Sequence, residues 1–201
     1  AGIENVVFST KHSANKLTGN TLKVPHLELK SQVEAYARKK FEAAIFVHMN
    51  FYYQNFLAWF LPRPGEDGDL AFGFPQGDTP MAAANVEDLG GVVNAIFDRP
   101  GDFAGRVVGI VGDDLRGKEY ARIMSEATGR MIKYNYIPRD VFASFDFPGA
   151  DILANMFEMN RLYILDSQTD LAECRKLYPE MQSFDGWAAN NTGGLVAGAD
   201  G

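Results

Sequence analysis

The sequence is poor in cysteine, in basic residues and in long hydrophobic runs. Its single cysteine among 201 residues, Cys174, excludes an internal disulfide framework and any zinc or iron–sulfur site built from several cysteines. There are 19 lysine and arginine residues against 26 acidic residues, which gives a net charge of -7. Because that charge repels phosphate, we expect no direct nucleic-acid partner. No basic segment followed by an apolar run stands at the start given, so no signal peptide is visible.

One hydrophobic run has the length of a membrane span. Residues 43–61 (AAIFVHMNFYYQNFLAWFL) number about 19, which is enough to cross the hydrocarbon core of a bilayer. The run is interrupted by His48, Asn50, Gln54 and Asn55, and polar side chains at mid-membrane cost free energy. A buried strand that leads into a helix explains the pattern better, so we predict no membrane span.

The remaining composition is typical of a folded α/β chain. Hydrophobic residues make up 46% and charged residues 22%, which is enough apolar side chain for a core without disulfides or metal. Up to residue 61, short apolar runs alternate with amphipathic segments, which predicts strands over 3–9 and 44–49 and helices over 30–39 and 52–61. This order is the signature of a parallel sheet with crossover helices.

The later elements are shorter, and their order is mixed. The apolar patterns predict strands over 70–74, 81–84, 107–111 and 131–137, and helices over 86–97, 118–128, 138–142, 152–162, 171–177 and 184–189. In the earlier helix, Val33, Tyr36 and Ala37 stand three and four residues apart. That spacing predicts that these three side chains share one buried face.

Six segments resemble the NmrA-like family, whose members are atypical short-chain dehydrogenases/reductases. They are VPHLELKSQVEAY (24–36), NFYYQNFLAWFLP (50–62), GDTPMAAANVEDLGGVV (77–93), FAGRVVGIVGDDLRGKEYA (103–121), FPGADILANMF (147–157) and LYPEMQSFDGW (177–187). Their order and spacing match the C-terminal two thirds of the family's fold. The sequence is most similar to the branch of cytosolic NADPH-sensing regulators.

The resemblance implies a partial Rossmann-like parallel sheet with a smaller C-terminal α/β subdomain. Residues 1–66, with contributions from 79–112, would form the C-terminal part of a dinucleotide-binding domain. The smaller subdomain, for substrate or partner, would comprise 67–78 and 113–190. Residues 191–201 are rich in glycine and alanine, and we expect them to form a flexible tail.

Two parts of the family's cofactor site have no counterpart in this sequence. They are the phosphate-binding turn of the G-x-x-G-x-x-G type and the basic residues that meet the 2′-phosphate of NADP. Ala1-Gly2 resembles the pair that precedes the family's fifth strand. At about 30 residues per βαβ unit, roughly 120 to 130 residues of a standard fold are expected outside the sequence. The resemblance therefore implies NADP(H) as the cofactor only if that half is present.

His26 and Lys30 stand where a short-chain reductase has its Tyr-x-x-x-Lys pair. The resemblance gives Lys30 the role of holding the nicotinamide ribose. It also makes His26 the candidate catalytic proton donor, since histidine transfers protons near neutral pH. The residues alone favour a plainer interpretation, in which His26 bonds a backbone carbonyl and Lys30 is a solvated lysine in the first turn of a helix.

The segment after the second strand is the other candidate cofactor contact. It contains Tyr52, Tyr53, Gln54 and Asn55. In α/β folds this carboxyl edge of the sheet is where ligands bind, and the resemblance implies contacts with the nicotinamide end of NADP. The alternative is a helix start whose aromatic residues belong to the core. Where the family has Arg-Pro at the strand end, this sequence has His48 and Asn50.

Two further groups of residues invite a chemical interpretation. Asp113-Asp114 resembles a metal-binding pair, but it has no third ligand and fits a solvated turn, so we predict no metal site. Cys174 has Arg175 and Lys176 beside it. Neighbouring cations lower a thiol pKa, which makes Cys174 a candidate redox-sensing thiol.

The resemblance implies a non-catalytic NADP(H)-binding redox sensor that acts through protein partners. A second interpretation is a structural or accessory subunit that kept the scaffold and lost the cofactor. A third is an NADPH-dependent reductase of a small carbonyl or quinone, acting through His26 and Lys30. Whether the protein is an enzyme stays open, as does its assembly as a homodimer or as a subunit of a larger complex. The family suggests the cytoplasm, and a targeting peptide outside the sequence would direct it to an organelle.

Overall fold

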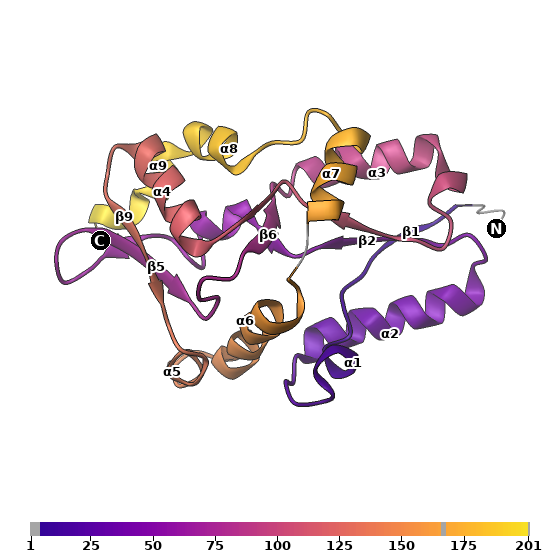
Figure 1. Ribbon diagram of the computed structural model, residues 1–201, viewed down its shortest axis with the longest axis horizontal. Helices are drawn as coiled ribbons and strands as arrows, with labels where there is room; N and C mark the ends of the chain where they lie inside the picture. Colours follow the sequence, from indigo (N-terminus) through magenta and orange to yellow (C-terminus); the bar gives the residue numbers. More distant parts are fainter. Residues whose placement is uncertain (1–4, 166–167, 201) are drawn as a thin grey trace.

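The β-strands are arranged in three-stranded sheets (Figure 1). The computed structural model describes residues 5–165 and 168–200. The strands are β1 (Val7–Ser9), β2 (Ile45–Met49), β3 (Phe51–Tyr52), β4 (Arg63–Pro64), β5 (Leu70–Phe74), β6 (Met81–Ala84), β7 (Val107–Ile110), β8 (Asp113–Leu115) and β9 (Ile132–Tyr136). Within the described part of the chain the strand orders are β1-β2-β7, β3-β6-β8 and β4-β5-β9.

The helices are interspersed among the strands as far as β9, and the described elements after β9 are all helices. They are α1 (Ala14–Thr18), α2 (Pro25–Lys40), η1 (Tyr53–Leu57), α3 (Asp88–Asp98), η2 (Pro100–Asp102), α4 (Gly117–Thr128), α5 (Arg139–Ala143), α6 (Ala150–Tyr163), α7 (Gln168–Leu177), α8 (Phe184–Asn190), α9 (Thr192–Leu195) and η3 (Ala197–Asp200). Helix α2 begins five residues earlier than the apolar pattern predicts, at Pro25. Proline suits this first helical position because the first backbone N–H of a helix has no partner inside the helix.

The first sheet is fully parallel and has helices on both faces, which confirms the predicted α/β class. Strand β2 pairs with β1 on one side and with β7 on the other. Figure 1 shows α2 on one side of these strands and α3 and α7 on the opposite side. Phe46 of β2 packs with Ala37 of α2, whereas Ile45 and Val47 pack with α3 and α7. This alternation is what two buried faces require of a strand.

The predicted buried face of α2 is wrong for two of its three residues. Ala37 is buried, but Val33 is 53% exposed and Tyr36 is 63% exposed. The helical spacing is correct, and it sets which side chains share a face. What covers that face depends on the neighbouring elements, and the main core clusters of the described residues include neither Val33 nor Tyr36.

A larger, aromatic core lies among β3, β5, β6, β9 and the helices α4, α6 and α8. Phe74 of β5 stacks on Phe157 of α6 with ring centroids 4.9 Å apart. Phe56 of η1 contacts Tyr120 of α4 and Phe184 of α8, with centroid distances of 5.3 Å and 5.4 Å. The first sheet has its own core. The division of the chain into two domains at the predicted boundaries stays a prediction.

Two predicted local structures are corrected. Residues 52–61 do not form an α-helix, because β3 ends at Tyr52 and only the 3-10 helix η1 follows. Asp113 and Asp114 do not lie in a solvated turn, because they form β8, which pairs antiparallel with β6. Strands of two or three residues carry too little periodicity for an apolar pattern to reveal them.

A flexible tail was predicted over 191–201, of which residue 201 lies outside the described residues, and the prediction is wrong for the rest. Helix α9 covers residues 192–195 and η3 covers residues 197–200, and Leu195 is fully buried in the aromatic core. The small residues of this segment predicted fraying, but the buried side chain of Leu195 anchors the segment to the aromatic core. Among the described residues, no helix combines the length and the apolar character that a bilayer crossing demands.

The burial of Leu195 predicts a large loss of stability in Leu195→Ala. The free energy of unfolding should fall by about 2 to 5 kcal/mol, because the substitution removes buried methyl groups and leaves a cavity. Leu29→Ala is the matched control, since Leu29 is 63% exposed, and it should change stability by no more than about 0.5 kcal/mol. Urea unfolding followed by circular dichroism measures both. Equal stability of the two variants would show that the C-terminal segment does not pack on the core.

Candidate functional site

A pocket of about 450 Å³ lies between the carboxyl edge of the first sheet and α6. It is lined by Lys11, His26, Leu27, Asn50, Phe51, Tyr52, Asn55, Trp59, Phe60, Phe147, Pro148, Gly149, Ile152, Leu153 and Met156. We call it the α2–α6 pocket after the helices that contribute its two sides. Its walls are mainly apolar and aromatic, with a few polar groups, as is usual for small-molecule sites.

Asn155 joins the two sides of the α2–α6 pocket. Its Nδ2 donates to the backbone carbonyl of Lys23, at 3.0 Å, and its Oδ1 accepts from Nε of Arg139, at 3.1 Å. Lys23 lies two residues before α2, so these bonds tie α6 to the start of α2. Next to them, Leu27 of α2 and Met159 of α6 are buried in one small apolar cluster.

The structure brings three of the predicted site residues together. His26, Tyr52 and Asn55 all line the α2–α6 pocket. Lys30 lies one turn further along α2 and donates from Nζ to Oγ of Ser9, at 3.0 Å. Ser9 ends β1, so Lys30 stands at the carboxyl edge of the sheet, close to the pocket without lining it.

Tyr53 is not among the residues that line the pocket. Its side chain is fully buried, and its ring contacts Phe184 and Trp187, with centroids 5.0 Å and 5.6 Å away. Its hydroxyl lies 3.5 Å from Oδ2 of Asp113. Burial raises the pKa of Tyr53 well above its ordinary value, and nearby Tyr120 and acidic groups raise it further. These contacts give Tyr53 a place in the aromatic core.

Gln54 also lies outside the pocket lining. Its amide Nε2 donates to Oδ1 of Asn85, and its Oε1 accepts from the backbone N–H of Val86, at 3.1 Å. Asn85 in turn donates to Oε1 of Gln182, at 3.1 Å. Gln54 therefore fixes the start of α3 and the segment before α8, and its amide is occupied by these partners.

Lys11 is the pocket residue that the sequence analysis did not identify. Its Nζ donates to the backbone carbonyls of Met49 and Asn50 at the end of β2. Burial lowers the pKa of Lys11 to about 8, with a smaller contribution from the charge of Lys30. The signal was present in the sequence, because Lys11 follows the end of the first strand by two residues and carboxyl ends of strands carry the ligand sites.

Acidic side chains are absent from the lining of the α2–α6 pocket as far as the described residues extend. No aspartate or glutamate is among those that line it. The pKa of His26 is lowered, first by desolvation of the ring and then by the charge of Lys11. At neutral pH His26 is therefore mostly the uncharged imidazole, and Lys11 carries the positive charge of the pocket.

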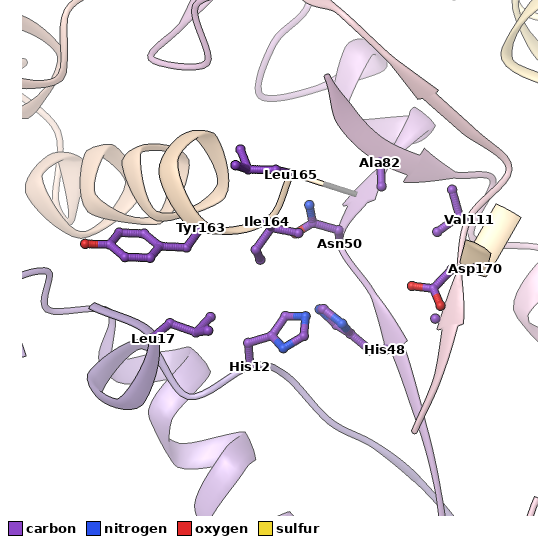
Figure 2. Close-up of a pocket in the computed structure, with 11 residues that line it drawn as sticks. His12, Leu17, His48, Asn50, Ala82, Val111, Tyr163, Ile164, Leu165 and Asp170 are labelled. Atoms are coloured by element: carbon purple, nitrogen blue, oxygen red, sulfur yellow. The ribbon is translucent and has the colours of Figure 1, made fainter. Parts of the chain in front are cut away.

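A second cavity, of about 420 Å³, adjoins the first. Figure 2 shows His12 and His48 facing each other there, with Asn50 and Ile164 above them. The two imidazole rings meet edge to face at 4.2 Å. Asn50 lines both cavities. Burial lowers the pKa of His48 well below its ordinary value, and the charges of His12 and Lys11 act in the same direction.

Cys174 and Asp113 are occupied by structural contacts. Sγ of Cys174 is buried and donates to the carbonyl of Gly109, at 2.8 Å, and burial raises its pKa to about 11. That direction contradicts the candidate redox-sensing thiol. Oδ2 of Asp113 accepts from the N–H of Phe184, at 2.6 Å. No cluster of three or more metal-ligating side chains occurs in the described ranges.

The parallel sheet with helices on both faces and a pocket at its carboxyl edge defines a Rossmann-like α/β protein of the short-chain dehydrogenase/reductase type. The chain belongs to the NmrA-like family, since a sequence model of that family matches residues 1–188. This finding confirms the resemblance that the six segments carry.

Curated relatives cover most of the chain. An NmrA-like family domain-containing protein of Dictyostelium discoideum is 24% identical over 192 residues, which are 91% of this chain and 64% of that protein. The NmrA-like family domain-containing oxidoreductase FrzB of Cladobotryum sp is 30% identical over 151 residues, which are 67% of this chain and 45% of FrzB. The chain therefore spans less than two thirds of the length of either relative.

Solved structures share the fold. NmrA, described as a negative transcriptional regulator, matches in its complexes with NAD and with NADP, each with a TM-score of 0.79, 21% identity and coverage of 93% of this chain and 64% of NmrA. The NADPH-dependent quinone oxidoreductase QOR2 of Escherichia coli matches with a TM-score of 0.67, 17% identity and coverage of 94% of this chain and 66% of QOR2. At these identities the likeness establishes the fold.

The buried imidazole of His48 predicts a pH-dependent stability. The pKa of His48 is lowered in the folded state, so below about pH 6.5 the unfolded chain binds a proton that the folded chain does not. The free energy of unfolding therefore decreases as the pH decreases. From about pH 7 to about pH 5.5, the wild type should lose about 1 kcal/mol more unfolding free energy than His48→Gln. Urea unfolding at both pH values measures this difference.

His26→Gln is the matched control for this measurement. The ring of His26 is exposed, and its pKa is lowered less strongly than that of His48. Its substitution should therefore change the pH dependence less. If His48→Gln and the wild type lose the same stability on acidification, His48 titrates normally in the folded protein.

Proposed function

We propose that the protein is an NADP(H)-binding redox sensor whose α2–α6 pocket receives the nicotinamide end of the dinucleotide. The observation that carries the proposal is the position of this pocket, which lies at the carboxyl edge of the parallel sheet and is lined by His26, Tyr52 and Asn55. Dinucleotides bind at this edge in Rossmann-type folds. The structures of NmrA in complex with NAD and with NADP support a dinucleotide as the ligand.

The residues of the chain fit the nicotinamide half of the cofactor. Lys30 and the hydroxyl of Ser9 lie 3.0 Å apart at the edge of the sheet, where both can bond the ribose hydroxyls. The amides of Asn50 and Asn55 suit the carboxamide group, and the ring of Tyr52, which is 38% exposed, offers a face for stacking. The 201 residues given contain no Gly-rich turn for the pyrophosphate, and the proposal concerns the nicotinamide end alone.

Binding in the α2–α6 pocket would link the cofactor to a surface for protein partners. Phe147 lines the pocket and contacts Phe142 of α5, with ring centroids 5.9 Å apart. Phe142 also contacts Phe145, at 5.3 Å. Phe145 is 41% exposed and Val141 is 48% exposed. A ligand that orders Phe147 would thus change an exposed apolar surface on α5, which is the behaviour of a sensor.

The proposal predicts saturable NADPH binding that depends on Lys30. Titration of the purified full-length protein, followed by nicotinamide fluorescence, should saturate, and Lys30→Ala should weaken binding about tenfold because a charge-assisted hydrogen bond to the ribose is lost. Lys39→Ala, on the exposed last turn of α2, is the control and should bind as the wild type does.

The outcomes separate the competing functions. Absence of saturable binding would discard the sensor and favour an accessory subunit that lost the cofactor. Saturable binding with unchanged affinity in Lys30→Ala would keep the sensor and remove Lys30 from the site.

A reductase is the second candidate, favoured by the two titratable groups that face the same pocket. His26 and Lys11 both line it, and the pKa of each is lowered toward neutrality or below. Such groups can hold or move a proton during turnover. FrzB and other relatives are described as oxidoreductases. When bound, NADPH would supply the hydride.

The reductase predicts NADPH oxidation that requires His26. With a small quinone as acceptor, the loss of NADPH absorbance should be enzyme-dependent, and His26→Gln should lower the turnover about a hundredfold, as expected for loss of a general acid. NADPH affinity should stay within about twofold, which separates catalysis from binding. Equal turnover in the variant and the wild type would remove His26 from the reaction.

A further inference from the structure

The α2–α6 pocket is lined by two chemically different groups of side chains. The polar group includes Lys11 and Asn50, which follow the ends of β1 and β2, and His26 of α2. The apolar group includes Trp59, Phe60 and Phe147. A pocket of about 450 Å³ falls within the range of drug-sized ligand sites, which is roughly 300 to 1,000 Å³.

We infer that this pocket binds a small aromatic acid, with its anionic group on Lys11 and its ring against Trp59. The inference deepens the proposed function and rests on it, since the ligand would occupy the same pocket beside the nicotinamide end. It names the chemical class of the second ligand and the residue that selects it.

The charge of the pocket favours a ligand with an anionic group. Lys11 is the one lysine or arginine among the lining residues, and the same set holds no aspartate or glutamate. In the described part of the structure Nζ of Lys11 makes hydrogen bonds to the carbonyls of Met49 and Asn50 and no ion pair. A desolvated ammonium without a carboxylate partner is stabilised by any anion that reaches it, and charge-assisted bonds of this kind are strong.

The exposure of Trp59 favours a ligand with an aromatic ring. Trp59 is a large hydrophobic residue, yet it is 82% exposed. It lines the pocket together with Phe60. Exposed apolar surface next to a pocket marks a binding site. Aromatic side chains favour aromatic ligands through offset or edge-to-face contact, which contributes about 0.5 to 1.5 kcal/mol beyond area burial.

A matched pair of fluorescent probes tests the inference. 8-Anilinonaphthalene-1-sulfonate and N-phenyl-1-naphthylamine share one aromatic skeleton, and only the first carries an anionic group. The wild type should bind the sulfonate about tenfold more tightly than the neutral probe. Lys11→Met should bind both probes equally, because the residue that attracts the anion is lost and the apolar wall is kept.

Controls locate the probes and guard against misfolding. Lys39→Met, on the surface of α2, should keep the wild-type preference for the anion. Trp59→Leu should weaken both probes, because each loses its aromatic contact. Asn50→Asp is the second charge variant and should also abolish the preference, since it adds a carboxylate beside Lys11. It keeps the test decisive if Lys11→Met fails to fold.

Two results would overturn the inference. One is an unchanged preference for the sulfonate in Lys11→Met or Asn50→Asp, and the other is unchanged binding of both probes in Trp59→Leu. Displacement by dodecanoate as effective as displacement by 1-naphthoate would overturn the aromatic part in favour of a fatty acid. A protein that binds the probes but not NADPH contradicts the proposed function alone, and the reverse result contradicts this inference alone.

Discussion

The bond between Asn155 and the backbone before α2 is the constraint on which the site depends. The carbonyl of Lys23 and the guanidinium of Arg139 satisfy both ends of this buried amide. Each partner would otherwise lose hydrogen bonding to water without compensation. Because the bond ties α6 to the start of α2, it fixes these two helices relative to each other. The α2–α6 pocket is the space left between them.

The regular elements were predictable where side chains repeat with a clear period. Strand β2 opens with the apolar run Ile45–Val47, as expected of a strand covered on both faces, and α4 and β5 begin and end close to their predicted limits. The exceptions have local causes. Strand β8 is a run of two aspartates and a leucine, and its carboxylate at Asp113 is held by Phe184 from a distant segment. No pattern within three residues encodes that partner.

The site was predictable only in part, because sequence position identifies the edge of the sheet but not the direction of each side chain. Tyr52 and Asn55 line the pocket, while Tyr53 between them is in the core. The strand β3 and the tight helix η1 turn successive side chains in opposite directions. The same edge rule applies to Lys11, which follows β1 by two residues. Its side chain reaches the carbonyls of Met49 and Asn50 at the end of β2, and no local pattern encodes that contact between distant segments.

The electrostatics of the pocket bear on whether it senses or catalyses. A neutral His26 is a poor acid at neutral pH, whereas Lys11, with a pKa of about 8, is mostly charged there and still able to release a proton. Its Nζ is held by two backbone carbonyls, and losing the proton would weaken those bonds. Proton release therefore works against the local structure, unless an incoming anion replaces the two carbonyls as the partner of the lysine. A lysine whose charge is held in this way binds and orients a ligand more readily than it transfers a proton. The charge and hydrogen bonds of Lys11 therefore favour the proposed binding role over the proposed reductase.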